Sequence, residues 1–316
     1  MDLSIIIVNW KSKEHLRGCI RSIVTGTHNL EWEIIVIDSG SFDGCGDMLE
    51  REYPFVRFVQ SQNNLGFAGA NNAAFARSTG EYVLFLNPDT EVKAGAVDQL
   101  YLSITSLPDA GIVGARLLNS DGSVQTSCIQ AFPSILNQML DAEPLRKAFP
   151  RSRLWGIAPL TDGANIPAEV DVISGACLMI SRRVFQSIGQ FSSEYFMYSE
   201  DVDLCLKAKR AGRRNYYVPS AEVVHYGGRS SAVKQENTFE SVMLVESQWR
   251  FFRKTRSHGY GWLYRTSILA ASAIRIMIAF ALRLAGHTTG RSALRKWMPR
   301  LRWALGFERW VKNYGT

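Results

Sequence analysis

Cysteine is scarce in this chain, and its spacing shows neither a disulfide nor a metal-site pattern. The 316 residues include five cysteines without a CxxC pair, at Cys19, Cys45, Cys128, Cys177 and Cys205. An odd, scattered set excludes a disulfide framework and a zinc site of the usual ligand spacing, so we expect a reducing, cytoplasmic location. The N-terminal segment MDLSIIIVNWK lacks a basic flank and a small-residue cleavage site, and it predicts a first strand rather than a secretion signal.

Repeats and low-complexity segments are missing as well. A composition of 46% hydrophobic and 21% charged residues with 10 prolines indicates a globular protein of one large domain or two. Acidic residues are almost absent from the C-terminal part, because residues 250–316 hold fourteen Lys/Arg and a single acid, Glu308. Residues 1–249 hold 22 Lys/Arg and 28 Asp/Glu, so the net charge of +7 describes a basic tail on an acidic body.

Short β-branched apolar runs alternate with helical segments through the first hundred residues. The runs predict buried parallel strands at Ser4–Val8, Glu33–Ile37, Val56–Val59 and Tyr82–Leu86. Helices are expected between them, at His15–Val24, Asp47–Glu52 and Phe67–Ser78. This order is that of a doubly wound α/β sheet, which binds ligands beyond the carboxyl ends of its strands. A nucleotide pocket is therefore expected at these ends.

The pattern changes after Gly111. GIVGARLL, a turn and SVQTSC predict an antiparallel hairpin that ends the parallel part, and the proline-rich residues 132–168 predict an irregular segment over the site. VDVISGACLMIS then predicts one further strand. Ser181 is expected to cap a short helix, and Gly212 is expected to end the helix EDVDLCLKAKRAG.

Seven segments, in this order, carry a resemblance to a known family: SIIIVNW, IIVIDSGSFDG, NNLGFAGANNAAF, LFLNPDTE, SGACLMISRRVF, YFMYSEDVDLCLKAKRAG and VVHYGG. The chain resembles the family 2 glycosyltransferases of the GT-A fold, and among them the rhamnosyltransferase-like enzymes of bacterial surface polysaccharide assembly. The resemblance covers residues 1–230 and implies a mixed, mostly parallel sheet flanked by helices, followed by a helical, basic region at 231–316.

The same resemblance implies an activity and its substrates. It implies an inverting, metal-dependent hexosyltransferase. The implied donor is dTDP-L-rhamnose, with a UDP-hexose as the alternative. The implied acceptor is a hydroxyl of a polyprenyl-diphosphate-linked glycan.

Polar residues at the strand ends, and at the helix start after Asn64, are expected to bind the donor. The carboxylate of Asp38 can accept the imide N–H of uracil or thymine, while the alternative is an aspartate that stabilises a turn. Glycines at a helix start leave backbone N–H groups free for a phosphate or sugar oxygen, although such glycines also serve only to turn the chain. The predicted donor-binding residues are Asn9, Asp38, Ser41, Asn64, Gly66, Asn71, Asn87 and Arg229.

Asn87-Pro88-Asp89 occupies the place of the family's metal-binding DxD motif, with the first acid missing. Because Mg²⁺ often uses only one or two carboxylates together with substrate phosphates, Asp89 and the donor diphosphate can suffice for Mg²⁺ or Mn²⁺. By resemblance, His225 is the second metal ligand. The alternatives are an ordinary turn at Asn87-Pro88-Asp89 and a structural histidine.

Glu200 and Asp201 stand in the first turn of a predicted helix. Acids at this position commonly interact only with the helix dipole. Inverting transfer, however, needs a carboxylate that takes the proton of the acceptor hydroxyl. The resemblance assigns this role to Asp201, with Glu200 as the neighbour that orients or contacts the acceptor.

The most apolar stretch of the C-terminal region, residues 263–285, is interrupted by Arg265, Arg275 and Arg283. A bilayer span needs roughly 20 apolar residues, so we expect this stretch to lie on an anionic membrane surface. The alternative is a helical subdomain packed on the core.

Two other classes of function are alternatives to the enzyme. One is nucleic-acid binding through the basic tail, which we do not expect because tryptophan-rich helices and an acidic body disfavour it. We expect instead a peripheral protein on the cytoplasmic face of the plasma membrane. A noncatalytic sugar-nucleotide or membrane-binding module with a decayed site is the other alternative, and Asn87 alone supports it.

Overall fold

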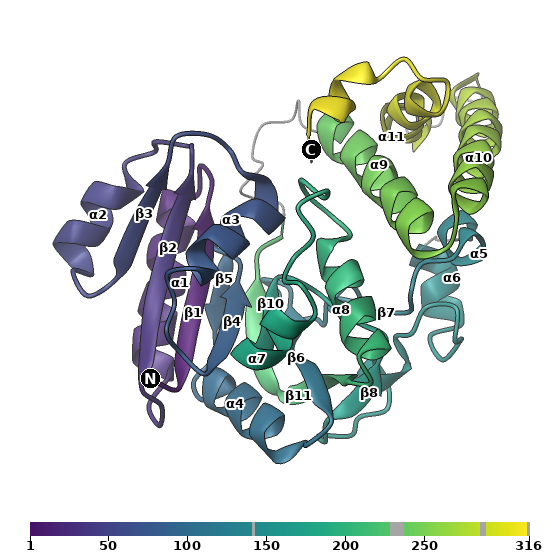
Figure 1. Ribbon diagram of the computed structural model, residues 1–316. Helices are drawn as coiled ribbons and strands as arrows, with labels where there is room; N and C mark the ends of the chain where they lie inside the picture. Colours follow the sequence, from purple (N-terminus) through teal and green to yellow (C-terminus); the bar gives the residue numbers. More distant parts are fainter. Residues whose placement is uncertain (141–142, 228–236, 285–288, 315–316) are drawn as a thin grey trace. The chain divides into compact units, whose positions relative to one another are not determined.

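A computed structural model describes residues 1–140, 143–227, 237–284 and 289–314 (Figure 1). The chain divides into two compact units. The sheet unit comprises Met1–Phe132, Arg146–Ser192 and Glu200–Ser230. The helical unit comprises Pro133–Leu145, Ser193–Ser199 and Ser231–Thr316.

Nine strands of the described chain form one sheet, in the order β3-β2-β1-β4-β10-β6-β11-β5, with β8 also pairing with β11. They are β1 (Leu3–Asn9), β2 (Trp32–Ser39), β3 (Arg57–Ser61), β4 (Tyr82–Leu86), β5 (Thr90–Val92), β6 (Ala110–Leu118), β8 (Ala168–Val170), β10 (Cys177–Ser181) and β11 (Arg214–His225). The strands β1 to β4 pair in parallel, as the sequence predicted. Beyond β4 the sheet is mixed, because β10 runs antiparallel to β4 and β6. The predicted GT-A architecture, a mixed sheet flanked by helices, is confirmed.

Helices pack on this sheet: α1 (Lys13–Gly26), α2 (Cys45–Glu52), α3 (Gly66–Phe75), α4 (Ala96–Ser106), α7 (Arg182–Ser187) and α8 (Glu200–Arg210). α3 packs on β1 and β2, while α4 and α8 pack on β6 and β11. Ile5, Ile6 and Ile7 are all fully buried, which explains why β1 is a continuous apolar run rather than an alternating one. All five cysteines are buried in this unit.

The helix boundaries predicted around α7 and α8 are confirmed. The Ser181 side chain accepts a hydrogen bond from the N–H of Val184 at the start of α7. Gly212 follows α8 with a φ of 76°, in the left-handed region that favours glycine.

The predicted hairpin after Gly111 is wrong beyond its turn. The turn forms, since the N–H of Asn119 donates to the Ser123 carbonyl at 2.7 Å, but only an isolated bridge between Leu118 and Val124 follows. The reason is that β11 runs parallel along one side of β6 and β10 pairs with Ile112–Gly114 on the other, so the returning chain meets only the end of β6. The parallel part of the sheet therefore does not end at β4.

The strand predicted over VDVISGACLMIS is divided in two. β9 (Val172–Ile173) pairs with β7 (Ile129–Gln130) in a separate two-stranded sheet, and β10 begins at Cys177. The residues between them, 174–176, form a turn. The described residues of 132–168 are largely irregular, as predicted, apart from α5 (Ile135–Met139), α6 (Glu143–Ala148), a 3-10 turn, η1 (Ala158–Leu160), and the start of β8 at Ala168.

Three long helices form the body of the helical unit: α9 (Asn237–Thr255), α10 (His258–Leu284) and α11 (Thr289–Ala304), followed by η2 (Arg309–Asn313). The three helices pack on one another. Tyr264, Phe252 and Trp303 are almost fully buried between them, and the Trp303 indole N–H donates to Glu246 at 2.8 Å. Among the described helices, the segment His258–Ala281 is long and apolar enough to cross a membrane by length and composition.

Candidate active site

Asp89 and His225 meet at the carboxyl end of the sheet. Asp89 lies just beyond β4 and is 3% exposed, and His225 is the last residue of β11. The strand register pairs His225 with Thr90, and the N–H of Tyr226 donates to the Asp89 carbonyl at 2.9 Å. His225 Nε2 consequently lies 3.5 Å from Asp89 Oδ1. Two residues far apart in the sequence, both predicted as metal ligands, are thus neighbours.

Gln125 orients the His225 ring, a role that sequence reasoning missed. Its Nε2 donates to the His225 carbonyl at 2.6 Å, and its Oε1 lies 3.0 Å from His225 Nδ1. Because Oε1 can only accept, Nδ1 is the donor of this pair, and in the neutral imidazole Nε2 is then the nitrogen that can bind a cation. Adjacent ligands of an octahedral cation stand about 3 Å apart, so the Asp89 and His225 atoms fit a shared hard cation. An isolated glutamine in a polar stretch gives no sequence signal for this position.

Asp201 is held at the start of α8 by backbone amides. Its Oδ2 accepts from the N–H of Gly175 at 3.0 Å, and its Oδ1 accepts from the N–H of Val202 at 2.8 Å. Burial raises its pKa, and these hydrogen bonds offset part of that rise. A half-buried carboxylate with a raised pKa is a chemically reasonable proton acceptor.

A short chain of contacts joins Asp201 to the segment that precedes Asp89. The N–H of Asn87 donates to the Ala176 carbonyl at 3.0 Å, and the next residue back, Gly175, holds Asp201. A Cβ at Gly175 would lie 3.2 Å from the Phe67 ring and 3.4 Å from the Asp201 Cβ, so this glycine lets α3 and α8 approach closely. The turn that divides the predicted strand therefore joins Asp201 to the segment that precedes Asp89 at one end of the sheet.

Glu200, beside Asp201, is the most strongly perturbed acid at this end of the sheet. It is 6% exposed, and its Oε2 accepts no hydrogen bond within the described part of the chain. Burial first, and then the charge of Asp201, raise the pKa of Glu200 well above its ordinary value. Glu200 therefore favours the neutral form, in which it does not compete with Asp201 for the proton of an acceptor.

We expect Glu200→Gln to stabilise the protein above mildly acidic pH. A carboxyl whose pKa is raised by folding contributes most to stability below its unfolded pKa, and that contribution is lost as the pH rises through the folded pKa. Glutamine removes this loss, so the melting temperature should exceed that of wild type at pH 8 and match it near pH 4. Each kcal/mol that the substitution adds to the free energy of unfolding should raise the melting temperature by about 2–4 °C.

Differential scanning calorimetry across this pH range measures the effect. Glu50→Gln, on an exposed position of α2, controls for the loss of one negative charge. A difference that does not change between pH 4 and pH 8 would contradict the burial of a neutral Glu200.

Asp38 is a fully buried carboxylate that already has its hydrogen bonds. Its Oδ1 accepts from Asn9 Nδ2 at 2.8 Å and from the Ser41 hydroxyl. Its Oδ2 accepts from the N–H groups of Ser41 and Phe42 and from Gln60 Nε2 at 2.7 Å. Burial alone would raise the Asp38 pKa, but these hydrogen bonds outweigh it and lower the pKa. This geometry matches the alternative in which Asp38 stabilises a turn. The imide N–H of a uracil or thymine could bind Asp38 only if one of these protein donors moved away.

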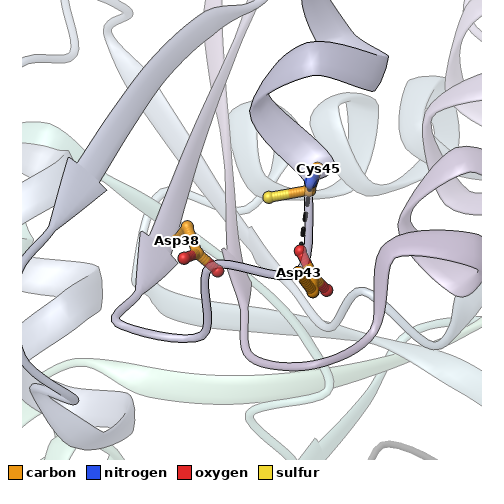
Figure 2. Close-up of side chains that lie close together, drawn as sticks. All are labelled: Asp38, Asp43 and Cys45. Atoms are coloured by element: carbon orange, nitrogen blue, oxygen red, sulfur yellow. Dashed lines mark hydrogen bonds between the residues drawn. The ribbon is translucent and has the colours of Figure 1, made fainter.

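Asp38, Asp43 and Cys45 form a second group with potential metal ligands (Figure 2). Their ligand atoms lie within 4.8 Å of one another. The amide Nδ2 of Asn9, however, donates to Asp38 at 2.8 Å and to both Asp43 oxygens at 3.2 Å, so the carboxylates already face a donor. Burial and the nearby carboxylates raise the Cys45 pKa, and a protonated thiol is a poor ligand for a hard cation. The donor set fits Mg²⁺ or Mn²⁺ less well than Asp89 and His225 do.

The polar residues at the start of α3 mostly bind the protein itself. Asn64 Oδ1 accepts from the N–H of Gly66 at 3.0 Å, and Gly66 begins the helix with a φ of 67°. Asn71 Nδ2 donates to the Phe67 carbonyl within the same helix. The neighbour of Asn71, Asn72, forms two hydrogen bonds with the backbone of Phe191. Asn71 is 2% exposed, so its side chain is enclosed by the protein.

The remaining predicted donor-binding residues differ in what the structure describes. Asn87 is half-buried, and its carbonyl accepts from the Thr90 hydroxyl at 2.7 Å, which fixes the turn into β5. Arg229 lies outside the described residues.

The fold and the acidic site at the ends of its strands define a GT-A glycosyltransferase. The chain belongs to glycosyl transferase family 2, because the sequence model of that family matches residues 4–189. Residues 151–311 also match the model of glycosyl transferase family group 2. It is rhamnosyltransferase-like.

Three relatives illustrate the similarity. An N-acetylglucosaminyl-diphospho-decaprenol L-rhamnosyltransferase of Mycobacterium tuberculosis is 30% identical over 93% of this chain and 94% of its own length. A rhamnosyltransferase of Escherichia coli (strain K12) is 28% identical over 51% of this chain and 61% of its own. The solved structure of a mannosyltransferase from Pyrobaculum calidifontis, in complex with GDP-Man and Mn²⁺, shares the fold with a TM-score of 0.58 at 16% identity, covering 96% of this chain and 86% of that one.

Proposed function

We propose that this protein transfers L-rhamnose from dTDP-L-rhamnose to a hydroxyl of a lipid-linked glycan, with inversion at the anomeric carbon. Hydrogen bonds connect Asp201 through Gly175 and Ala176 to Asn87, two residues before Asp89. This connection carries the proposal, because it joins a possible proton acceptor to the segment that holds a possible metal ligand. The decaprenol-linked relative supports the acceptor class. The Mn²⁺-containing structural neighbour supports a divalent cation.

The chemistry follows from the residues. Asp201 takes the proton of the acceptor hydroxyl as the new C–O bond forms on one face of the sugar, while the bond to the diphosphate breaks on the other, which inverts the configuration. Asp89 and His225 would hold the cation, and Gln125 would keep Nε2 of His225 available to it. When bound, the cation would neutralise the charge of the leaving diphosphate.

A radiolabel transfer assay tests the function. The full chain is incubated with dTDP-L-rhamnose, UDP-glucose or GDP-mannose and with a short-chain polyprenyl-diphosphate N-acetylglucosamine, and the product anomer is assigned by NMR. We expect turnover with dTDP-L-rhamnose at least about tenfold faster than with the other donors. Turnover only with a UDP-hexose would replace the donor, and no turnover with any donor would favour the noncatalytic alternative.

We also propose that α10 lies on an anionic membrane surface. Between Trp262 and Ala281, the exposed residues of α10 are uncharged: Trp262, Leu263, Thr266, Ala270, Ile274, Met277, Ile278, Phe280 and Ala281. Arg283, near the end of the helix, is exposed, whereas the other two arginines that interrupt the run lie elsewhere on the helix. Arg265 donates to the carbonyls of Trp303 and Ala304, and Arg275 donates to the carbonyl of Met139. An uninterrupted apolar face with exposed cations nearby, such as Arg295 and Lys296, suits the boundary of an anionic bilayer.

We expect replacement of this face to release the protein from membranes. The triple variant Leu263→Gln, Ile274→Gln and Met277→Gln removes three exposed side chains, each contributing on the order of 1 kcal/mol, so affinity for phosphatidylglycerol vesicles should fall roughly 100-fold. Vesicle flotation measures it.

Leu102→Gln, at an exposed position of α4 in the sheet unit, is the matched control and should float as wild type does. If wild type stays in the soluble fraction, or if the triple variant floats equally well, the apolar face of α10 has another role.

A further inference from the structure

The helical unit contains a cavity of about 980 Å³ with a basic lining. α9 contributes more lining residues than any other element, and α10, the end of α11, the segment after it, η2 and Glu194 complete the wall. The charged and aromatic side chains that line it are Glu194, Glu246, Trp249, Arg250, Arg253, Lys254, His258, Arg265, Trp303, Glu308 and Arg309. The site described above does not use this cavity.

The three acids of the lining are already paired with cations. Each carboxylate has a partner, in the pairs Glu246 with Arg250 at 2.9 Å, Glu194 with Lys254 at 3.0 Å, and Glu308 with Arg302 at 2.6 Å. Arg302 lies outside the lining, so the acids neutralise only two of the five Lys/Arg side chains of the wall. The cavity therefore retains positive charge.

Three guanidinium groups carry that charge. Within the described part of the chain, Arg253, Arg265 and Arg309 form no ion pair with a carboxylate. The guanidinium of Arg253 lies 4.4 Å from the centre of the Trp249 ring, which holds it in place. Arg265 is fixed by the Trp303 and Ala304 carbonyls at 2.9 and 3.0 Å. These arginines are therefore ordered by groups that leave their charge uncompensated.

Two buried donors of the same wall lack acceptors. Arg253 Nε and Trp249 Nε1 are buried, and neither has a hydrogen-bond partner among the described residues. Leaving such a donor without an acceptor costs about 1–3 kcal/mol. Because both atoms have almost no accessible surface, an incoming group cannot reach them, and it is the charge of the lining that favours an anion.

We propose that this cavity binds a phosphate or diphosphate group through Arg253, Arg265 and Arg309. Guanidinium groups bind phosphate oxygens with paired, charge-assisted hydrogen bonds. The volume lies at the upper end of the roughly 300–1,000 Å³ typical of small-molecule sites, far more than one phosphate fills. Trp249, Trp303 and Leu305 line the same cavity and suit the organic group that carries the phosphate. The proposal does not depend on the transferase activity.

Isothermal titration calorimetry of the full chain with inorganic pyrophosphate tests the site. EDTA is present throughout, so that a divalent cation at Asp89 and His225 cannot bind the probe. We expect wild type to bind with one site, and Arg253→Gln and Arg309→Gln each to bind about 10- to 100-fold more weakly. Arg256→Gln, at an exposed cation close to the end of α9 but outside the lining, is the matched control and should bind as wild type does.

The variants also keep the test decisive if one of them misfolds. Arg253 packs closely against Gly261 and Trp249, whereas Arg309 is exposed, so Arg309→Gln should leave the melting temperature unchanged. No binding by wild type, or equal binding by all four proteins, overturns the proposal.

A second arm identifies where the phosphate comes from. Flotation with phosphatidylglycerol vesicles is repeated with Arg253→Gln and with pyrophosphate as competitor. If the cavity binds a lipid headgroup, both changes should lower vesicle binding. If its ligand is a soluble phosphate compound, vesicle binding should stay at the wild-type level while pyrophosphate binding is still lost.

Discussion

Asp201→Asn should lower the rate of sugar transfer by about 10² to 10⁴ while donor affinity stays near that of wild type. The substitution keeps the size of the side chain and removes its capacity to accept a proton. It also leaves one of the two amides that Asp201 binds, those of Gly175 and Val202, without an acceptor, so a stability loss of about 1 kcal/mol should accompany it. Single-turnover kinetics with saturating donor measure the rate.

Asp203→Asn separates the chemical effect from the structural one. Asp203 is on the same helix and 1% exposed, and it accepts from the Ser192 hydroxyl at 2.6 Å. This variant should lose stability but keep kcat within threefold of wild type. If Asp201→Asn behaves in the same way, Asp201 is not the base.

Chelation of divalent cations should abolish transfer, and Asp89→Ala and His225→Ala should each raise the metal concentration needed for half-maximal activity by at least about 100-fold. Each variant would remove one of the two proposed ligands of a cation that would stabilise the leaving diphosphate. Gln125→Met should have a smaller effect, about 10-fold, because it removes only the hydrogen bond that orients the His225 ring. Titration of activity with Mg²⁺ and Mn²⁺ measures all three.

Cys45→Ser distinguishes the two candidate metal sites. If Asp38, Asp43 and Cys45 hold the cation, this variant should need more metal, while Asp89→Ala should not. We expect the reverse. Full activity in excess EDTA would contradict both assignments, and the leaving group would then depend on protein donors alone.

The sequence was sufficient for those parts of the fold that depend on local patterns. Continuous apolar runs such as Ile5–Ile7 indicated parallel strands, and Ser181 and Gly212 indicated the limits of helices, because capping and burial follow from neighbouring residues. SVQTSC alternates as a strand does, but a strand also needs a sufficient length of free sheet edge. The sequence does not reveal that β10 already pairs with Ile112–Gly114 of β6, which leaves only the end of β6 for the returning chain.

The site was predictable only in part for a similar reason. Resemblance to a family predicted Asp89, His225 and Asp201 as site residues, but the groups that hydrogen-bond to His225 and Asp201 come from segments distant in the chain. Gln125 reaches His225 across one hundred residues, and Gly175 supports Asp201 only because a strand breaks there. Arg265 and Arg275 also looked like interruptions of an apolar stretch, since a sequence does not show which side of a long helix is packed.

The burial of all five cysteines makes thiol chemistry a selective reporter. Burial raises the pKa of Cys177 to about 12 and that of Cys128 to about 11, so little thiolate is present at neutral pH. Native protein should therefore resist alkylating reagents and air oxidation without added reductant. Because the helical unit contains no cysteine, the labelling rate in mild denaturant follows the opening of the sheet unit alone. The cysteines thus report the opening of the sheet unit separately from that of the helical unit.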